Sequence, residues 1–187
     1  MILTVIEQHI AVINQLKTMT AKITAVAEVC SLAIKAGKRI YLMGNGGSAA
    51  DSQHIAAEFV GRFQIERQSL PALALTTDTS ILTAVGNDYG FDEIFARQVR
   101  AFVQPDDIVI GISTSGNSAN ILNAMVCAQQ QGGVTVALTG QGGGKLAACC
   151  DYCLAVPSPI TARVQEAHIL IGHILCQYVD EVLYGDQ

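Results

Sequence analysis

The sequence has few charged side chains. Asp, Glu, Lys and Arg make up 14% of its 187 residues, whereas hydrophobic residues make up 50%. Intrinsically disordered chains are poor in apolar residues, so this composition excludes disorder and predicts a folded core. So little charge does not cover the surface of a monomer, and we therefore expect a homo-oligomer that buries apolar surface between its subunits.

Three further features are missing, and each excludes a class of protein. No apolar run reaches the roughly 20 residues that a membrane-spanning helix needs, because His173 and Gln177 interrupt the run 169–179. No basic segment followed by an apolar core stands at Met1, so we expect no signal peptide and a cytoplasmic protein with reduced thiols. No basic stripe accompanies the net charge of -5, which argues against a general nucleic-acid binder.

Strand-like and helix-like segments alternate along the chain. Strands that are apolar throughout and are separated by helices indicate a parallel sheet covered on both faces. We therefore predict an α/β fold, an open three-layer sandwich with about five parallel strands behind an N-terminal α-helical hairpin. The strands are expected at 39–43, 72–75, 108–112, 134–138 and 153–156, and the helices at 1–36, 49–59, from Thr79, and at 92–102, 119–130 and 161–183.

No linker or shift of composition divides the chain. We expect residues 1–187 to form a single domain. Within it, residues 1–36 would be a helical extension used in oligomerisation, and residues 37–187 would form the α/β core.

Two strand–loop–helix units carry small and polar residues. The loop 44–48 reads Gly-Asn-Gly-Gly-Ser, and the loop 113–118 reads Ser-Thr-Ser-Gly-Asn-Ser. Each opens a helix whose free N–H groups and dipole favour an anion, and the hydroxyl groups of the second can donate to phosphate oxygens. Neither is a Walker loop or a GxGxxG motif. One such loop alone is more often a turn with a helix cap, but two in one small domain favour a ligand site at the carboxyl ends of the strands.

Two histidines are candidates for chemistry. His54 and Glu58 are four residues apart on an expected helix, so they share a face and can chelate a metal or act as an acid/base pair. A hydrogen-bonded surface pair is the commoner alternative. His173 lies among apolar residues of the last helix, so its ring needs a partner or faces a cavity. A core histidine with a satisfied hydrogen bond is an equal alternative there.

Together these motifs resemble the sugar isomerase (SIS) domain family and, within it, the phosphoheptose isomerases. The resemblance covers nearly the whole chain, and it is carried by the two loops, the pair His54 and Glu58, Gly86-Asn87-Asp88, and Arg163-Val164-Gln165-Glu166 followed by His173. It implies a flavodoxin-like sheet, a homotetramer, and conversion of sedoheptulose 7-phosphate, a phosphorylated seven-carbon sugar, into D-glycero-D-manno-heptose 7-phosphate. That reaction begins the synthesis of nucleotide-activated heptose for lipopolysaccharide core or other surface glycans.

The resemblance also implies roles for individual residues. Glu58 and His173 match the positions assigned to proton transfer. The positions that hold zinc in metal-bound members are matched by His54, Glu58, Gln165 and His173. The phosphate cradle is matched by Ser113, Thr114, Ser115 and Ser118. The other substrate-contacting positions are matched by Asn45, Gly46, Gly47, Glu58, Asn87, Asp88 and Gln165. Glu58 and Gln165 thus belong to more than one of these sets.

Two binding proteins built on the same domain are alternatives to the enzyme. The DnaA initiator-associating protein resembles this sequence over 69–100, but it is a regulator without a catalytic set at the positions of Glu58 and His173. The presence of both residues here favours the isomerase. A sugar-phosphate sensor fused to a DNA-binding domain is disfavoured, because the sequence has no helix-turn-helix extension and no basic patch.

Overall fold

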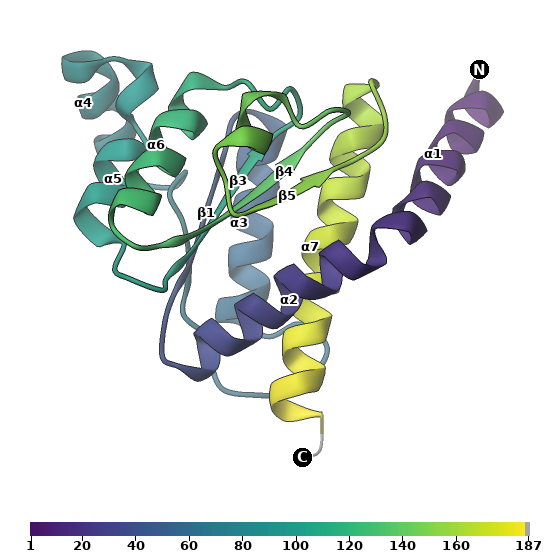
Figure 1. Cartoon of the computed structure of the whole chain (residues 1–187), viewed down its shortest axis with the longest axis horizontal. Coiled ribbons are helices and arrows are strands. Elements are labelled where there is room, and N and C mark those ends of the chain that lie inside the picture. Colours follow the sequence, from purple (N-terminus) through teal and green to yellow (C-terminus); the bar gives the residue numbers. More distant parts are fainter. Residues whose placement is uncertain (186–187) are drawn as a thin grey trace.

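Five parallel strands form the centre of the computed structural model, which describes residues 1–185 (Figure 1). The strand order is β2-β1-β3-β4-β5. The strands are β1 (Ile40–Gly44), β2 (Ala72–Ala74), β3 (Ile108–Ser113), β4 (Val134–Thr139) and β5 (Tyr152–Ala155). This arrangement confirms the predicted α/β fold with a parallel sheet. Because Gly44 pairs with Ile112, the neighbouring strands β1 and β3 end at the same level, and the loops that follow them start together.

Alternate residues along each strand contribute to two separate cores. Ile40 and Leu42 belong to the core on one face of the sheet, and Tyr41 and Met43 belong to the core on the other. The first face is covered by α2 (Thr20–Lys35), α3 (Gly47–Val60) and α7 (Thr161–Tyr184). The second face is covered by α5 (Ala96–Phe102) and α6 (Ala119–Gln130), with α4 (Thr79–Tyr89) beside them. The strands other than the edge strand β2 are largely apolar because helices bury both of their faces, whereas Leu73 of β2 remains 45% exposed.

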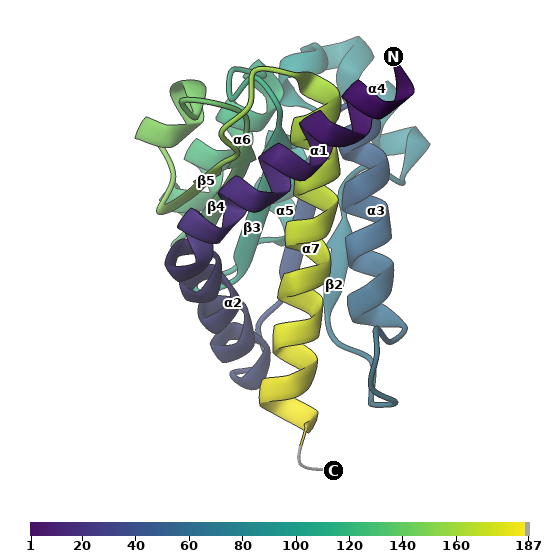
Figure 2. The same cartoon turned by 90° about the vertical axis from the view of Figure 1, so that its right-hand side faces the viewer.

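The N-terminal segment is a bent helical pair and not the expected hairpin. One 3-10 turn, η1 (Lys17–Met19), joins α1 (Ile2–Leu16) to α2, and the chain runs on without folding back (Figures 1 and 2). Lys17 and Thr20 keep right-handed helical dihedral angles, and no Gly or Pro stands nearby to reverse the chain. The two helices differ in burial: α2 packs into the first core, whereas α1 leaves large apolar side chains exposed, namely Ile2, Leu3, Val5, Ile6 and Ile10.

Two smaller differences concern short helices. The helix expected over 92–102 is divided into a 3-10 turn, η2 (Phe91–Glu93), and α5, which begins at Ala96. A further 3-10 turn, η3 (Gly144–Ala148), follows β4. Among residues 1–185, no helix combines the length and the apolar character needed to cross a membrane.

Candidate active site

The two loops that were singled out in the sequence lie next to each other, and an amide pair joins them. Asn45 of the first loop and Asn120 of α6 exchange two hydrogen bonds, each Nδ2 donating to the other Oδ1 at 2.9 Å. Asn120 is buried, with 2% of its surface exposed. The loop after β1 is therefore fixed to the helix that follows the loop after β3. Asn120 was not among the predicted site residues, because an Asn within a helix gives no signal until its partner is known.

The hydroxyl groups of the second loop converge as a phosphate cradle requires. Ser113 Oγ lies 2.9 Å from Ser118 Oγ and 3.5 Å from Ser115 Oγ. Ser118 is the N-cap of α6, and its side chain makes no capping hydrogen bond. Thr114 is half-buried between these residues. Hydroxyl donors thus surround the N-terminus of a helix of ordinary length, which is a favourable place for an anion.

A third loop, residues 140–143, and the 3-10 turn η3 that follows it hold the cradle in place. The backbone N–H of Leu146 donates to Gly116 O at 3.0 Å, and that of Lys145 donates to Asn117 Oδ1 at 3.1 Å. Gly116 has a φ of 66°, and a Cβ at this position would lie 2.1 Å from Gly143 O. Only glycine fits there, so the shape of the cradle depends on its close contact with the third loop.

Helices α3 and α7 run side by side in the same direction (Figure 2). Near the start of both helices, the amide of Gln165 lies against Gly47, where a Cβ would be 2.6 Å from Nε2. Further along, Gly172 lies against Ile55, where a Cβ would be 2.4 Å from Cδ1. The small residues Gly47 and Gly172 therefore allow the two backbones to approach closely and bring polar side chains of both helices to one seam.

His54, Glu58 and His173 meet along this seam. His54 Nε2 lies 3.0 Å from His173 Nε2 and 3.4 Å from Glu58 Oε1. The ring of His173 stacks on Phe63, with ring centroids 5.4 Å apart and planes inclined by 22°. The side chains of His54 and Glu58 remain 50% and 25% exposed, so a ligand can reach them. The partner that His173 needed in an apolar helix is therefore a second histidine on α3.

Three of the four expected zinc ligands lie along this seam, and two separations among them, His54 to His173 and His54 to Glu58, are those that a shared metal allows. Two ligands of one tetrahedral zinc, each about 2.1 Å from it, are about 3.4 Å apart, close to both separations given above. Imidazole nitrogen and carboxylate oxygen are also donors that zinc prefers. Gln165 lies against Gly47, well before His54 on α3, and is not part of this cluster. Within residues 1–185, no three His, Cys, Asp or Glu side chains surround a single point as ligands around a bound metal would.

Asn87 and Asp88 are not brought to this cluster. They lie exposed on α4, and Asn87 Nδ2 donates to Asp88 Oδ1 at 2.8 Å. Figure 1 shows α4 beyond α5 and α6, far from α7. Gly46, with a φ of 55°, is exposed in the first loop.

Known proteins share this architecture and much of the sequence. The family model described as SIS domain matches residues 6–140. A phosphoheptose isomerase from Akkermansia muciniphila is 52% identical over 170 residues, which cover 91% of this chain and 90% of that protein. The chain belongs to the phosphoheptose isomerase family of SIS-domain proteins. It is therefore an isomerase by family, and the recognition made from its motifs is confirmed.

Solved structures of the phosphoheptose isomerase family agree with this assignment. Phosphoheptose isomerase GmhA from Neisseria gonorrhoeae has a TM-score of 0.92 and 43% identity, covering 96% of this chain and 97% of that one. A phosphoheptose isomerase from Francisella tularensis has a TM-score of 0.88 and 39% identity, covering 97% and 99%. The N-terminal helices and α7 are thus within the matched architecture.

Three other polar residues near the start of α7 make contacts within the protein. Arg163 donates to both carboxylate oxygens of Glu166, and His9 Nδ1 of α1 lies 2.7 Å from Glu166 Oε2. The Arg163 guanidinium lowers the pKa of Glu166. His168 is fully buried and lies 3.0 Å from Thr139 O, and burial lowers its pKa to about 4. His168 is therefore a core histidine, in contrast to His173.

Proposed function

We propose that this protein isomerises sedoheptulose 7-phosphate to D-glycero-D-manno-heptose 7-phosphate in the cytoplasm, as a homotetramer. The product would supply nucleotide-activated heptose for lipopolysaccharide core or other surface glycans. One observation carries the proposal: His173 of α7 meets His54 and Glu58 of α3, the helix that follows the loop 44–48, in a chain of the phosphoheptose isomerase family.

The proposed chemistry is a proton exchange between neighbouring carbons. A ketose becomes an aldose through an enediol when a proton leaves C1 and another is delivered to C2, while the hydroxyl protons move between the oxygens. We assign the transfer of the carbon-bound proton, from C1 to C2, to Glu58 and His173. Both side chains are partly exposed along the seam between α3 and α7, so the substrate can approach them. His54 holds the pair together, since it contacts both.

The phosphate group would bind away from the reacting carbons. Ser113, Thr114, Ser115 and Ser118 present their hydroxyl groups at the N-terminus of α6, and this loop lies on β3 and not on the helices that carry Glu58 and His173. Binding energy from the phosphate can then be used to hold the sugar against the proton-transfer groups.

Zinc is the metal we propose for this site. His54, Glu58 and His173 would hold it, whereas Gln165, the fourth residue that the resemblance implies, lies beside Gly47 and not among them. When bound, a divalent cation supplies a Lewis acid that stabilises negative charge on the sugar oxygens. The remaining contacts of the sugar would come from the first loop, through Asn45, Gly46 and Gly47.

The direct test is incubation of the purified protein with sedoheptulose 7-phosphate. We expect the aldose phosphate to appear, as followed by NMR, and we expect chelator treatment to slow its appearance and added zinc to restore it. A protein that binds the sugar phosphate without converting it, with or without zinc, would refute the isomerase and favour the regulator.

The phosphate cradle gives a second test. Replacing Ser115 or Ser118 by Ala is expected to weaken binding of the sugar phosphate by about 1–2 kcal/mol each, or roughly 5–30-fold in Kd, the scale of a charge-assisted hydrogen bond. Calorimetry measures the loss, and Ser69→Ala, at an exposed serine ahead of β2, is the matched control. Wild-type affinity in both cradle variants would contradict the assignment.

A further inference from the structure

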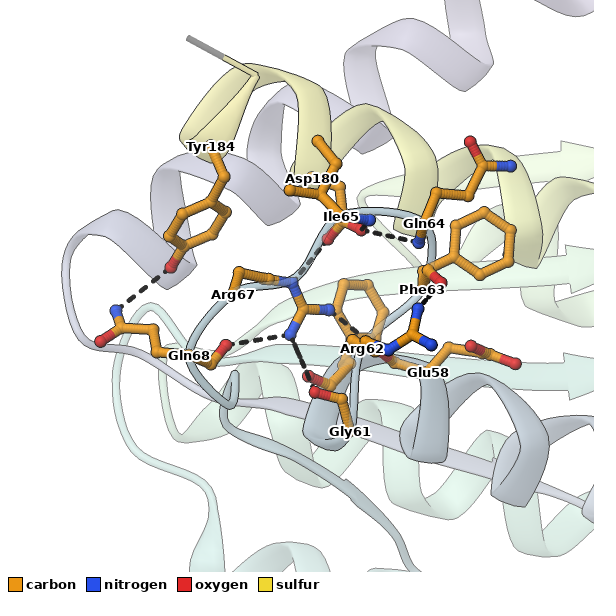
Figure 3. Close-up of polar contacts among 11 residues, drawn as sticks. Glu58, Gly61, Arg62, Phe63, Gln64, Ile65, Arg67, Gln68, Asp180 and Tyr184 are labelled. Atoms are coloured by element: carbon orange, nitrogen blue, oxygen red, sulfur yellow. Dashed lines mark hydrogen bonds and ion pairs between the residues drawn. The ribbon is translucent and has the colours of Figure 1, made fainter. Parts of the chain in front are cut away.

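A buried ion pair lies where α3 ends, and neither of its members is among the predicted site residues (Figure 3). Arg67 Nε donates to Asp180 Oδ1 at 2.6 Å. The side chains are 0% and 1% exposed. Removing two charges from water is costly, so a pair this deeply buried is retained only where it forms further hydrogen bonds.

The further hydrogen bonds of this pair all go to the backbone around the end of α3. Arg67 donates to the carbonyl oxygens of Glu58 at 3.0 Å and of Phe59 at 2.9 Å, and also to those of Gly61 and Gln68. The last carbonyls of a helix have no partners within the helix, and the fork of a guanidinium can satisfy several of them at once. Arg67 is therefore the cap of α3.

Asp180 binds the turn that follows. Its Oδ2 accepts hydrogen bonds from the backbone N–H groups of Gln64 and Ile65, at 3.2 and 3.3 Å. Figure 3 shows the turn wrapped around the two charged groups, with Phe63 at its outer side. The turn is thus fixed to α7 through Asp180 and to α3 through Arg67.

This turn reaches the proposed site through Phe63, whose ring stacks on His173. Asp180 lies about two turns beyond His173 on α7, so the helix that anchors the turn is also the helix that carries His173. Arg67 also binds the backbone of Glu58 itself. The buried pair therefore contacts the backbone of Glu58 and also supports the ring of Phe63, which packs on His173.

We propose that Arg67 and Asp180 are positioning residues for the isomerisation: they hold Phe63 against the imidazole of His173 and so fix the placement of His173 relative to Glu58. They act through Phe63 and the end of α3, and they touch neither substrate nor reacting atoms. The proposal rests on the proposed function for its effect on catalysis, but the placement of Phe63 on His173 is a structural claim that can be tested separately.

The first measurement does not use activity. The ring of Phe63 shifts the Hε1 resonance of His173, which is one of only four histidines in the chain and is assigned by comparison with His173→Asn. Phe63→Leu should move this resonance, and Arg67→Lys, which keeps the charge but lacks the fork, should move it in the same direction. Arg100→Lys is the control, because Arg100 pairs with Glu93 on the surface of α5. A resonance unchanged in Arg67→Lys would overturn the proposal, whatever the enzyme activity.

The second measurement is kinetic. Arg67→Lys and Phe63→Leu should each lower kcat by at least about tenfold while KM changes little, since a displacement of about 1 Å can cost about 10²-fold in rate. The deuterium isotope effect on kcat should rise, whereas a mere loss of folded protein would leave it unchanged. The double variant should lose no more than the larger single effect. Additive losses with an unchanged isotope effect would reject the positioning role.

The outcomes separate the two proposals. If the wild-type protein does not convert the sugar but the resonance moves as expected, the proposed function fails and the structural claim stands. If Arg67→Lys does not fold, Phe63→Leu decides alone, because Phe63 is only half-buried and its replacement leaves the ion pair in place. Normal kcat and isotope effect in Phe63→Leu would then overturn the inference.

Discussion

Glu58→Gln is expected to lower the turnover of sedoheptulose 7-phosphate by at least about 10²-fold, the usual scale for loss of a general base. Glutamine keeps the size and hydrogen bonding of the side chain beside His54 but cannot take a proton. It also binds metal more weakly, so zinc content must be measured with the rate. Glu28→Gln, at an exposed position on α2, is the matched control and should keep the wild-type rate.

His173→Asn is expected to lower the turnover of sedoheptulose 7-phosphate at least as much as Glu58→Gln does. The variant loses the imidazole that contacts His54 and stacks on Phe63, while the position is only half-buried and the helix remains intact. Light scattering should show an unchanged assembly, which separates lost chemistry from lost structure. A rate near that of the wild type in this variant or in Glu58→Gln would reject the roles assigned to both residues.

Another large effect is expected on folding, from removal of the N-terminal helices. Deletion of residues 1–36 is expected to prevent recovery of a folded protein, because α2 buries Ile23, Val26, Ala27 and Ile34 in the core beneath α7. Burial of each larger apolar side chain contributes about 1.5–3 kcal/mol, and the whole stability of a domain is about 5–15 kcal/mol. Circular dichroism and light scattering should show an aggregated or unfolded product.

Deletion of residues 1–16 is the matched comparison. Only Val12 and Leu16 of α1 are buried, so we expect this shorter chain to fold with a cooperative thermal transition. Because α1 carries exposed apolar side chains, we expect its loss to dissociate the proposed tetramer into smaller species. A stable fold for residues 37–187, or an unchanged tetramer without α1, would contradict these expectations.

The sequence was sufficient to predict the sheet and most helices, because strands buried on both faces are apolar throughout and the intervening segments have helical periodicity. The strand ends differ from prediction by at most one residue. The hairpin was wrong because the helical pattern over 1–36 indicates helix but does not say whether the chain reverses at Lys17. The exposure of α1 was also beyond reach, since an apolar helix face looks the same whether its own chain or another covers it.

The candidate site also has a part that the sequence indicates and a part that it does not. Local motifs indicated the two loops and the shared face of His54 and Glu58, and the apolar surroundings of His173 indicated that it needs a partner. The residues that reasoning missed depend on distant partners: Asn120 pairs with Asn45, 75 positions away, and Arg67 and Asp180 are 113 positions apart. In a sequence, a buried charge looks like a solvated surface charge, so only the fold reveals the cap at the end of α3.

The placement of the proposed phosphate cradle has an evolutionary consequence. The hydroxyl groups lie between β3 and α6, while Glu58 and His173 lie on α3 and α7. With the roles proposed above, mutations on the two helices would eliminate turnover without disturbing the hydroxyl groups. A duplicated gene that lost Glu58 and His173 would still encode a protein able to capture the sugar phosphate, and selection could then retain it as a sensor of the metabolite that its ancestor consumed.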